Sequence, residues 1–216
     1  MPAAYAGQPL VTDDAAVVTP DTCQLEAWQE SSHASRQYGL TPACNPFGDL
    51  ELGVSAARTR GDGGERSSQS QIQAKSTLVS RDGGAWALGA EAGLRRDTSG
   101  PRGTSAFQTT YAKGLASLYP SDALQVDVNL GAANTYGNGT IVLAGADVQY
   151  SPLDRVQLLG EVFRDEPGRA KYQAGIRFTV IPDRFEAFVS YGSRFAGRAD
   201  DWWAIAGIRL QSPPLR

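Results

Sequence analysis

Polar and charged side chains alternate with apolar ones in several short stretches of the sequence. Within 172–180, 185–194 and 202–211, one face carries polar and charged residues, such as Arg177 and Glu186, and the other face is apolar. A period of two is the spacing of side chains on one face of a β-strand. Acids and bases on such a face can orient a polar or zwitterionic solute across a narrow interior, or they can pair and neutralise one another. The pattern predicts recognition by charge rather than bond-making chemistry.

The cost of burying charge in lipid decides which face points outward. An Arg or Lys side chain at the middle of a bilayer costs a β-barrel about 2–4 kcal/mol. The face with Val126, Val128 and Leu130 should therefore meet lipid, and the charged face should line the interior. The predicted pore-lining residues are Glu51, Lys75, Glu91, Arg95, Asp127, Asp147, Glu161, Arg177, Glu186, Arg194 and Arg209.

Catalytic chemistry has little support in the sequence. The single histidine, His33, lies in a short turn beside Ser31, Ser32 and Ser35. A catalytic histidine needs a nucleophile and an orienting group within hydrogen-bond reach, and a turn this short is expected to be solvated instead. We expect no enzyme activity, no cofactor and no metal.

Twelve alternating stretches must position the charged residues. Most approach ten residues, and a tilted strand of roughly 9–11 residues crosses a bilayer. The even number places both chain ends on one side, expected to be the periplasm. The predicted strands are 23–32, 35–45, 50–60, 67–80, 85–96, 104–119, 124–136, 140–151, 155–165, 171–181, 184–195 and 201–211.

These strands predict an all-β protein, a transmembrane antiparallel up-and-down β-barrel of the bacterial outer membrane. A soluble β-sandwich or closed barrel is the alternative, but soluble strands average five or six residues. The 216 residues form one domain, without a run of eighteen apolar residues that could make a membrane helix. The net charge of −3 and the scattered basic residues argue against nucleic-acid binding. We expect a monomer in contact with outer-membrane lipid.

A few aromatic residues complicate the alternation. Trp28, Trp203 and Phe188 fall on the polar face, and the stretch 107–119 fits either phase, with a bulge expected near Gly114. The aromatic residues expected to face outward near strand ends, as interfacial girdles, are Trp86, Tyr119, Tyr150, Tyr172, Tyr191 and Trp202.

The two cysteines indicate an oxidising compartment. Cys23 and Cys44 lie on the first two predicted strands, and the point midway between them falls at His33 and Ala34 in the intervening turn. Positions equidistant from the turn of an antiparallel hairpin face each other. We therefore expect a Cys23–Cys44 disulfide, as in periplasmic or exported proteins; two free thiols in the cytosol are the alternative.

The chain divides into an N-terminal segment over 1–22, a barrel over 23–212 and a tail over 213–216. The start lacks the basic and apolar regions of an export signal, so we expect that a signal was removed and Met1 added. Residues 1–22 form either a disordered periplasmic tail or a plug inside the barrel. In the plug, Asp13 and Asp14 would pair with Arg177 or Arg209.

The beginning of the chain also resembles a known family. Pro9, Leu10, Thr12, Asp13 and Asp14 match its opening motif, and Gln24, Leu25 and Glu26 match its first strand. This motif is similar to that of proteobacterial outer-membrane proteins grouped under a phenol meta-pathway label. The resemblance implies an outer-membrane barrel and transport of small, including aromatic, compounds. The ending "GIRLQSPPLR" departs from the terminal aromatic residue of many barrels, although Leu210 could take that role.

The interior of a twelve-stranded barrel is wider than that of a small barrel filled by side chains and narrower than that of a water-filled porin. We expect a narrow passive channel for small polar or aromatic molecules. A plugged structural barrel or a membrane scaffold of a larger envelope assembly is the alternative, and an outer-membrane enzyme is a minor one. The sequence identifies no solute.

Overall fold

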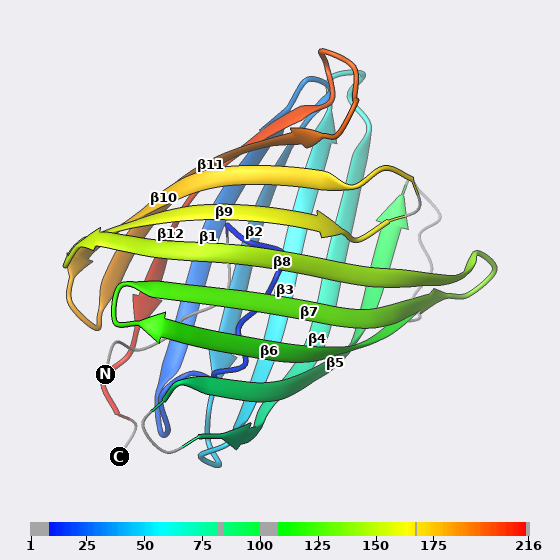
Figure 1. The fold of residues 1–216 in the computed structure, drawn as a ribbon. Coiled ribbons are helices and arrows are strands. Elements are labelled where there is room, and N and C mark those ends of the chain that lie inside the picture. Colours follow the sequence, from blue (N-terminus) through cyan, green and yellow to red (C-terminus); the bar gives the residue numbers. More distant parts are fainter. Residues whose placement is uncertain (1–8, 82–83, 100–107, 167, 215–216) are drawn as a thin grey trace.

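Twelve antiparallel strands close into one barrel in the computed structural model, which describes residues 9–81, 84–99, 108–166 and 168–214 (Figure 1). The strands are β1 (Cys23–Ser32), β2 (Ser35–Cys44), β3 (Leu50–Gly61), β4 (Arg66–Ser80), β5 (Trp86–Ser99), β6 (Thr109–Ser121), β7 (Leu124–Thr135), β8 (Gly139–Leu153), β9 (Val156–Arg164), β10 (Lys171–Ile181), β11 (Phe185–Arg194) and β12 (Trp202–Gln211). In the described residues, no helix has the length and apolar character needed to cross a membrane.

The predicted barrel is therefore confirmed, with small differences at the strand ends. The sixth strand differs most, because it was expected over 104–119 and is found as β6 over Thr109–Ser121. Residues 104–107 of that prediction lie outside the described residues. Short turns between strands of alternating polarity are enough to specify an up-and-down barrel, since each strand pairs with its neighbour in the chain.

The barrel has two distinguishable mouths. Strand β1 starts and β12 ends at the same end, called here the terminal mouth, and the opposite end is the distal mouth (Figure 1). Strands β1 and β12 pair with each other and close the barrel. At the terminal mouth Cys23 faces Cys44 in the β1–β2 register, and the two form the predicted disulfide.

The outer wall is a belt of apolar side chains. Val54, Leu130 and Val142 are each more than half exposed, and many other Leu, Val and Ile residues project from the same face. A contiguous apolar surface of this kind is rare on soluble proteins and is what a lipid-facing barrel presents. Tyr150, Tyr172 and Tyr191 also face outward, as expected for interfacial girdles.

The phase of β6 corrects one expectation about these aromatic residues. Its register with β5 and β7 runs without interruption past Gly114, so the bulge expected there is absent, and the shift comes instead between Leu118 and Ser121. This register gives Tyr119 the parity of the inward residues Leu115 and Ser117. Tyr119 therefore lies on the inner face and is not part of an outward girdle. The sequence did not reveal this phase because Leu115, an apolar residue, also occupies the inner face.

Large aromatic residues on the inner face lie against glycines of the neighbouring strand. Trp28 faces Gly39 across β1 and β2, and a methyl group at Gly39 would come within 2.2 Å of the indole ring. The missing side chain lets the ring lie flat along the wall instead of projecting into the lumen. The same arrangement pairs Trp203 with Gly192, Phe188 with Gly207 and Tyr111 with Gly93.

Candidate functional site

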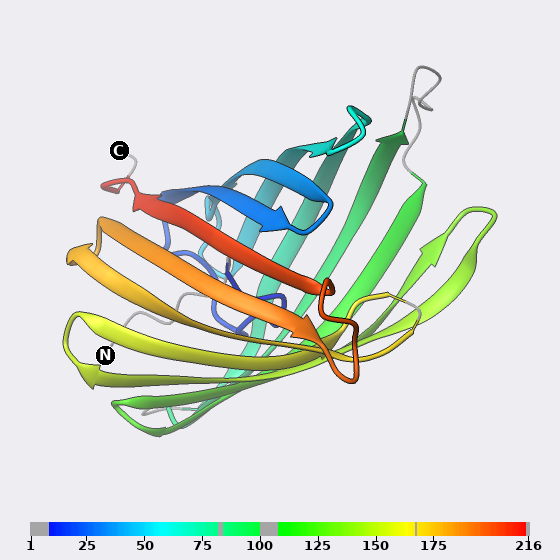
Figure 2. The same ribbon diagram turned by 90° about the horizontal axis from the view of Figure 1, so that it is seen from above.

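An N-terminal segment of the chain lies inside the barrel. Residues 9–22, called here the lumen segment, lead from the start of β1 at the terminal mouth into the interior (Figure 2). Leu10, Ala15 and Val18 are almost completely buried, and Ala15 packs with Ala87 and Leu115 of the wall. Of the two structures expected for this part of the chain, the described residues adopt the one inside the lumen.

Glu161 on β9 holds the inner end of the lumen segment. Its carboxylate accepts hydrogen bonds from the backbone N–H groups of Val11, at 3.0 and 3.1 Å, and of Thr12. Gln173 on β10 donates its amide to the carbonyl of Pro9 at 2.6 Å and to Glu161 at 2.7 Å. Hydrogen bonds from backbone amides to a buried carboxylate are among the stronger neutral-to-charged contacts in proteins.

Uncharged side chains of the wall form hydrogen bonds with the backbone in the middle of the lumen segment. Asn129 on β7 accepts a hydrogen bond from the Asp13 N–H at 2.7 Å and donates one to the Asp13 carbonyl at 2.7 Å. Ser117 accepts from the Ala15 N–H at 2.8 Å, and Thr77 donates to the Ala15 carbonyl at 2.7 Å. The wall thus replaces the strand partners that an extended chain would otherwise need.

Two residues near the terminal mouth secure the outer end of the segment. Glu51 on β3 accepts a hydrogen bond from the Val18 N–H at 2.9 Å. Asn45, which is fully buried, donates to the Val18 carbonyl at 2.6 Å. The lumen segment is therefore anchored along its length, on strands from opposite sides of the barrel.

Lys75 on β4 is the main cation that faces the lumen segment. Its Nζ lies 3.1 Å from Asp13, 3.4 Å from Asp14 and 4.0 Å from Glu51, and its side chain is 3% exposed. The expected pairing of Asp13 and Asp14 with Arg177 or Arg209 is therefore wrong. The path of the segment brings the two aspartates to β4, and the arginines lie on β10 and β12, where wall residues neutralise them.

Arg177 and Arg209 belong to a second charged cluster. Arg209 binds Glu26 at 2.8 Å and Glu186 at 3.0 Å, and Arg177 lies 3.9 Å from Glu186. Arg177 also donates to Gln157 at 2.8 Å. Some charged side chains of the wall therefore pair with one another, and others, such as Lys75, bind the lumen segment.

Three acidic residues form a row across β7, β8 and β9. Asp147 lies between Asp127 and Glu161 in register. Asp127 accepts from Ser117, Gln125 and Gln149. Neither carboxylate oxygen of Asp147 has a hydrogen-bond partner among the described residues, although the side chain is buried. The row therefore places three neighbouring carboxyl groups in the wall of the lumen without a cation between them.

The predicted pore-lining residues all lie on the inner face of their strands. Eight of them are buried in the lumen, Glu186 is partly exposed, and the side chains of Arg95 and Arg194 are 39% and 38% exposed. Arg95 pairs with Asp97, and Arg194 pairs with Glu166. Sequence reasoning missed Glu26, whose position in its strand marks it as inward, and Lys113, which lies in the stretch 107–119 that fits either phase.

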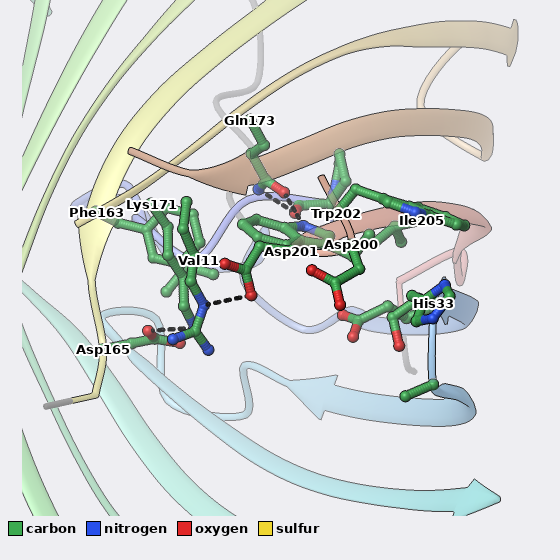
Figure 3. Close-up of a pocket in the computed structure, with 16 residues that line it drawn as sticks. Val11, His33, Phe163, Asp165, Lys171, Gln173, Asp200, Asp201, Trp202 and Ile205 are labelled. Atoms are coloured by element: carbon green, nitrogen blue, oxygen red, sulfur yellow. Dashed lines mark hydrogen bonds and ion pairs between the residues drawn. The ribbon is translucent and has the colours of Figure 1, made fainter. Parts of the chain in front are cut away.

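A cavity of about 430 Å³, called here the vestibule, opens at the distal mouth and reaches down to the lumen segment. Pro9 and Val11 contribute to its lining. Figure 3 shows Lys171 and Asp165 on one side of this cavity and Asp200 and His33 on the other. The vestibule thus connects the outside of the barrel with the inner end of the segment.

Aromatic rings and carboxylates surround an ammonium group in the vestibule. Nζ of Lys171 lies 5.6 Å from the ring centroid of Phe163 and 5.8 Å from that of Trp203. Asp165 and Glu166 bind the same Nζ at 2.9 and 3.0 Å. Aromatic faces with carboxylates form a favourable environment for an organic cation, and the protein supplies its own.

The pKa values of the two aspartates of the lumen segment shift in opposite directions. It raises the pKa of Asp14 to about 7, and Asp13, Asp127 and Glu51 act in the same direction against Lys75. Burial also raises the pKa of Asp13, but Lys75 and Lys113 outweigh it and hold that pKa below its usual value. Asp14 is therefore the group of the segment that changes protonation near neutral pH.

We expect docking of the lumen segment to weaken as the pH rises. A released Asp14 has a pKa of about 3.9, so the stabilisation from its proton is complete below that value and is lost as the pH approaches 7. The docking free energy should fall by up to about 1.4 kcal/mol per pH unit in this window. Single-channel recordings should show more openings at pH 8 than at pH 5. Asp14→Asn should abolish the difference, and an unchanged pH dependence in this variant would contradict the assignment.

The part of the chain that the structure describes holds no candidate metal centre. No group of three or more His, Cys, Asp or Glu side chains there could hold a metal ion. His33 lines the vestibule but forms no hydrogen bond with another described residue. The lumen and the vestibule offer charge, hydrogen bonding and aromatic contact to a bound molecule.

Comparison with solved structures relates this architecture to known porins. The barrel is similar to a KdgM porin, with a TM-score of 0.63 and 11% identity over 87% of this chain and 98% of that one. A KdgM porin in complex with disordered oligogalacturonate matches with a TM-score of 0.63 and 10% identity, over the same shares of the two chains. The NanC porin matches with a TM-score of 0.62 and 8% identity over 88% of this chain and 98% of that one. At these identities the likeness shows the fold.

Family comparison gives the relationship by sequence. The comparison with curated proteins found no match. The family model described as "Uncharacterised conserved protein UCP029691" matches residues 1–211. That description does not mention the phenol meta-pathway label of the family resembled by the N-terminal motif, while the outer-membrane porin fold implied by that resemblance is present. The chain therefore belongs to the family of Uncharacterised conserved protein UCP029691 and has the twelve-stranded barrel of the outer-membrane porins.

Proposed function

We propose that this protein is a passive outer-membrane channel for small polar or aromatic molecules, closed in its resting state by the lumen segment. The observation that carries the proposal is how the lumen is filled. A chain segment held by hydrogen bonds and ion pairs occupies it, so the wall side chains alone do not close it. Such a segment can leave without unfolding the barrel.

The orientation follows from general properties of such barrels. The apolar belt would span the membrane, and both chain ends would face the periplasm. The Cys23–Cys44 disulfide suits that compartment, which is oxidising. We propose that the barrel acts as a monomer, without a cofactor and without catalysing a reaction. Solutes would then enter from outside through the vestibule at the distal mouth.

The charge of the interior favours cationic and neutral solutes. Among the described residues, the buried carboxylates Asp14, Glu26, Glu51, Glu91, Asp127, Asp147 and Glu161 outnumber the buried cations Lys75, Arg177 and Arg209. One similar porin is described in complex with oligogalacturonate, an acidic sugar chain. An acid-rich lumen would repel such a polyanion, so we propose a different class of solute here. The phenol meta-pathway resemblance stays a prediction that adds aromatic compounds to the solutes worth testing.

Planar-bilayer recordings test the proposal directly. We expect few or no openings with the full chain and regular conductance steps with a chain that lacks residues 1–22, because the lumen is then free. In a salt gradient the reversal potential of the truncated form should indicate cation preference. Benzylamine should reduce the current more than benzoate, its ring-matched anion. If truncated protein that is folded and inserted in the bilayer showed no current, the proposal of a channel would be overturned.

The occupied lumen also favours a second candidate, a permanently closed barrel that acts as a membrane scaffold. In that case removal of residues 1–22 would lower the stability of the barrel without producing current. A stoichiometric periplasmic partner should also co-purify with the full chain. These results differ from those expected of a channel, so the same two proteins distinguish the candidates.

A further inference from the structure

Four arginines gather on the outer wall at the distal mouth, outside the lumen. Arg36 faces Arg60 in the β2–β3 register, and Arg60 faces Arg66 in the β3–β4 register. Arg58 lies two residues from Arg60 on the same face of β3, and all four side chains are exposed. Arg36, Arg58, Arg60 and Arg66 are called here the arginine patch. Strands β2, β3 and β4 are neighbours in the barrel wall (Figure 1).

The register of the arginine patch is unfavourable without an anion. Like charges directly opposite each other on neighbouring strands repel, since their Cβ atoms lie only about 4.5–5.5 Å apart. None of the four arginines forms an ion pair with a described carboxylate. The acidic residues of the adjoining turn, Asp62 and Glu65, form no ion pair with them either. A bound anion would relieve this repulsion.

Hydroxyl groups and a hollow complete the patch. Tyr38 faces Arg58 in register, and Arg58 faces Ser68, which in turn faces Thr98 on β5. These residues, with Arg60 and Arg66, line a cavity of about 510 Å³ on the outer wall. Guanidinium groups bind phosphate through paired N–H donors, and the Tyr38 hydroxyl adds a further donor, whereas the hydroxyls of Ser68 and Thr98 bond to each other.

The position of the patch identifies the source of the phosphate. Towards the middle of the barrel, the same outward face continues with the apolar residues Leu40, Val54 and Ile72. The arginines therefore lie at the edge of the apolar belt, at the level of lipid headgroups. We propose that the arginine patch binds the phosphate of a membrane lipid whose acyl chains lie along these apolar residues.

Matched lipids test this site. In neutral detergent micelles, dioleoyl phosphatidate should raise the melting temperature of the full chain, and dioleoylglycerol, which lacks only the phosphate, should not. Inorganic phosphate alone should have little effect, because it lacks the acyl chains that meet the belt. Equal stabilisation by both lipids, or by inorganic phosphate and phosphatidate, would overturn the proposal.

Variants distinguish binding from a structural role. The triple change Arg58→Gln, Arg60→Gln, Arg66→Gln should weaken phosphatidate binding by roughly tenfold or more, since each guanidinium contributes charged hydrogen bonds. The same variant should melt at a higher temperature without lipid, because the repulsion is gone. Arg155→Gln with Arg184→Gln, at exposed turns of the terminal mouth, is the matched control and should keep the full response. An equal loss in the control, or a lower melting temperature of the triple variant without lipid, would contradict the site.

Discussion

Replacement of Lys75 by methionine is expected to release the lumen segment from the barrel wall. Lys75 is the cation that binds Asp13 and Asp14 and lies 4.0 Å from Glu51. Removing one partner of a buried ion pair costs about 3–5 kcal/mol, because the opposite charge stays buried without compensation. Here three carboxylates would repel one another around an apolar side chain. Hydrogen exchange of the amides of residues 12–18 should accelerate, and bilayer recordings should show frequent openings.

Lys113→Met is the matched control for this experiment. Lys113 also points into the lumen, and its ion pair within the described ranges is with Glu91 at 2.8 Å. It makes no hydrogen bond or ion pair with the lumen segment, although it contributes to the low pKa of Asp13. Its loss should destabilise the barrel while amide exchange in the segment changes little. If both variants released the segment equally, the special role of Lys75 would be wrong.

Replacement of Glu161 by alanine should free the inner end of the segment. The variant loses the acceptor of the Val11 and Thr12 amides and of the Gln173 side chain. A hydrogen bond to a charged group contributes about 1.5–3 kcal/mol, and a buried donor left without a partner adds its desolvation cost. Exchange should accelerate at residues 11 and 12 first. The vestibule should also deepen, since Pro9 and Val11 contribute to its lining.

Asp147→Asn provides the control from the same acidic row. Asp147 is as deeply buried as Glu161, but it accepts no hydrogen bond from a described residue and does not bind the segment. Its replacement by the neutral amide removes an ionisable carboxyl group between Asp127 and Glu161. The melting temperature should stay the same or rise, and the segment should stay docked. Faster exchange in the segment of this variant would mean that the charge of the row, rather than the contacts of Glu161, controls docking.

Alternation alone was enough to predict the barrel wall. A strand with one apolar face has only one orientation in lipid, so the faces of Glu51, Lys75 and Arg177 could be assigned without knowing the fold. Hairpin symmetry similarly placed Cys23 opposite Cys44, because antiparallel pairing is fixed by the position of the turn. Both predictions depend only on residues close in sequence or on one strand.

Contacts across the lumen could not be predicted in the same way. The choice of Lys75 over Arg177 or Arg209 depends on the path of the lumen segment, which is set by many weak contacts such as those of Asn129 and Ser117. The vestibule was missed for a similar reason, since Lys171 and Trp203 come from strands whose relative heights follow from the shear of the closed sheet. The phase of strand β6 could not be predicted, because the apolar residue Leu115 on its inner face obscures the alternation of polar and apolar positions.

The pairing of β1 with β12 has a consequence for the order of assembly. Every other pair joins strands that follow one another in the chain, so each can form with its hairpin, whereas this seam unites the two ends of the sheet. Closing it also buries the ion pair of Glu26 and Arg209, whose charges stay hydrated until the two strands meet. We expect the seam to form last. The lumen segment continues directly into β1, so it stays attached to one edge of the open sheet. The sheet can therefore curve around the segment before β1 pairs with β12 and closes the barrel.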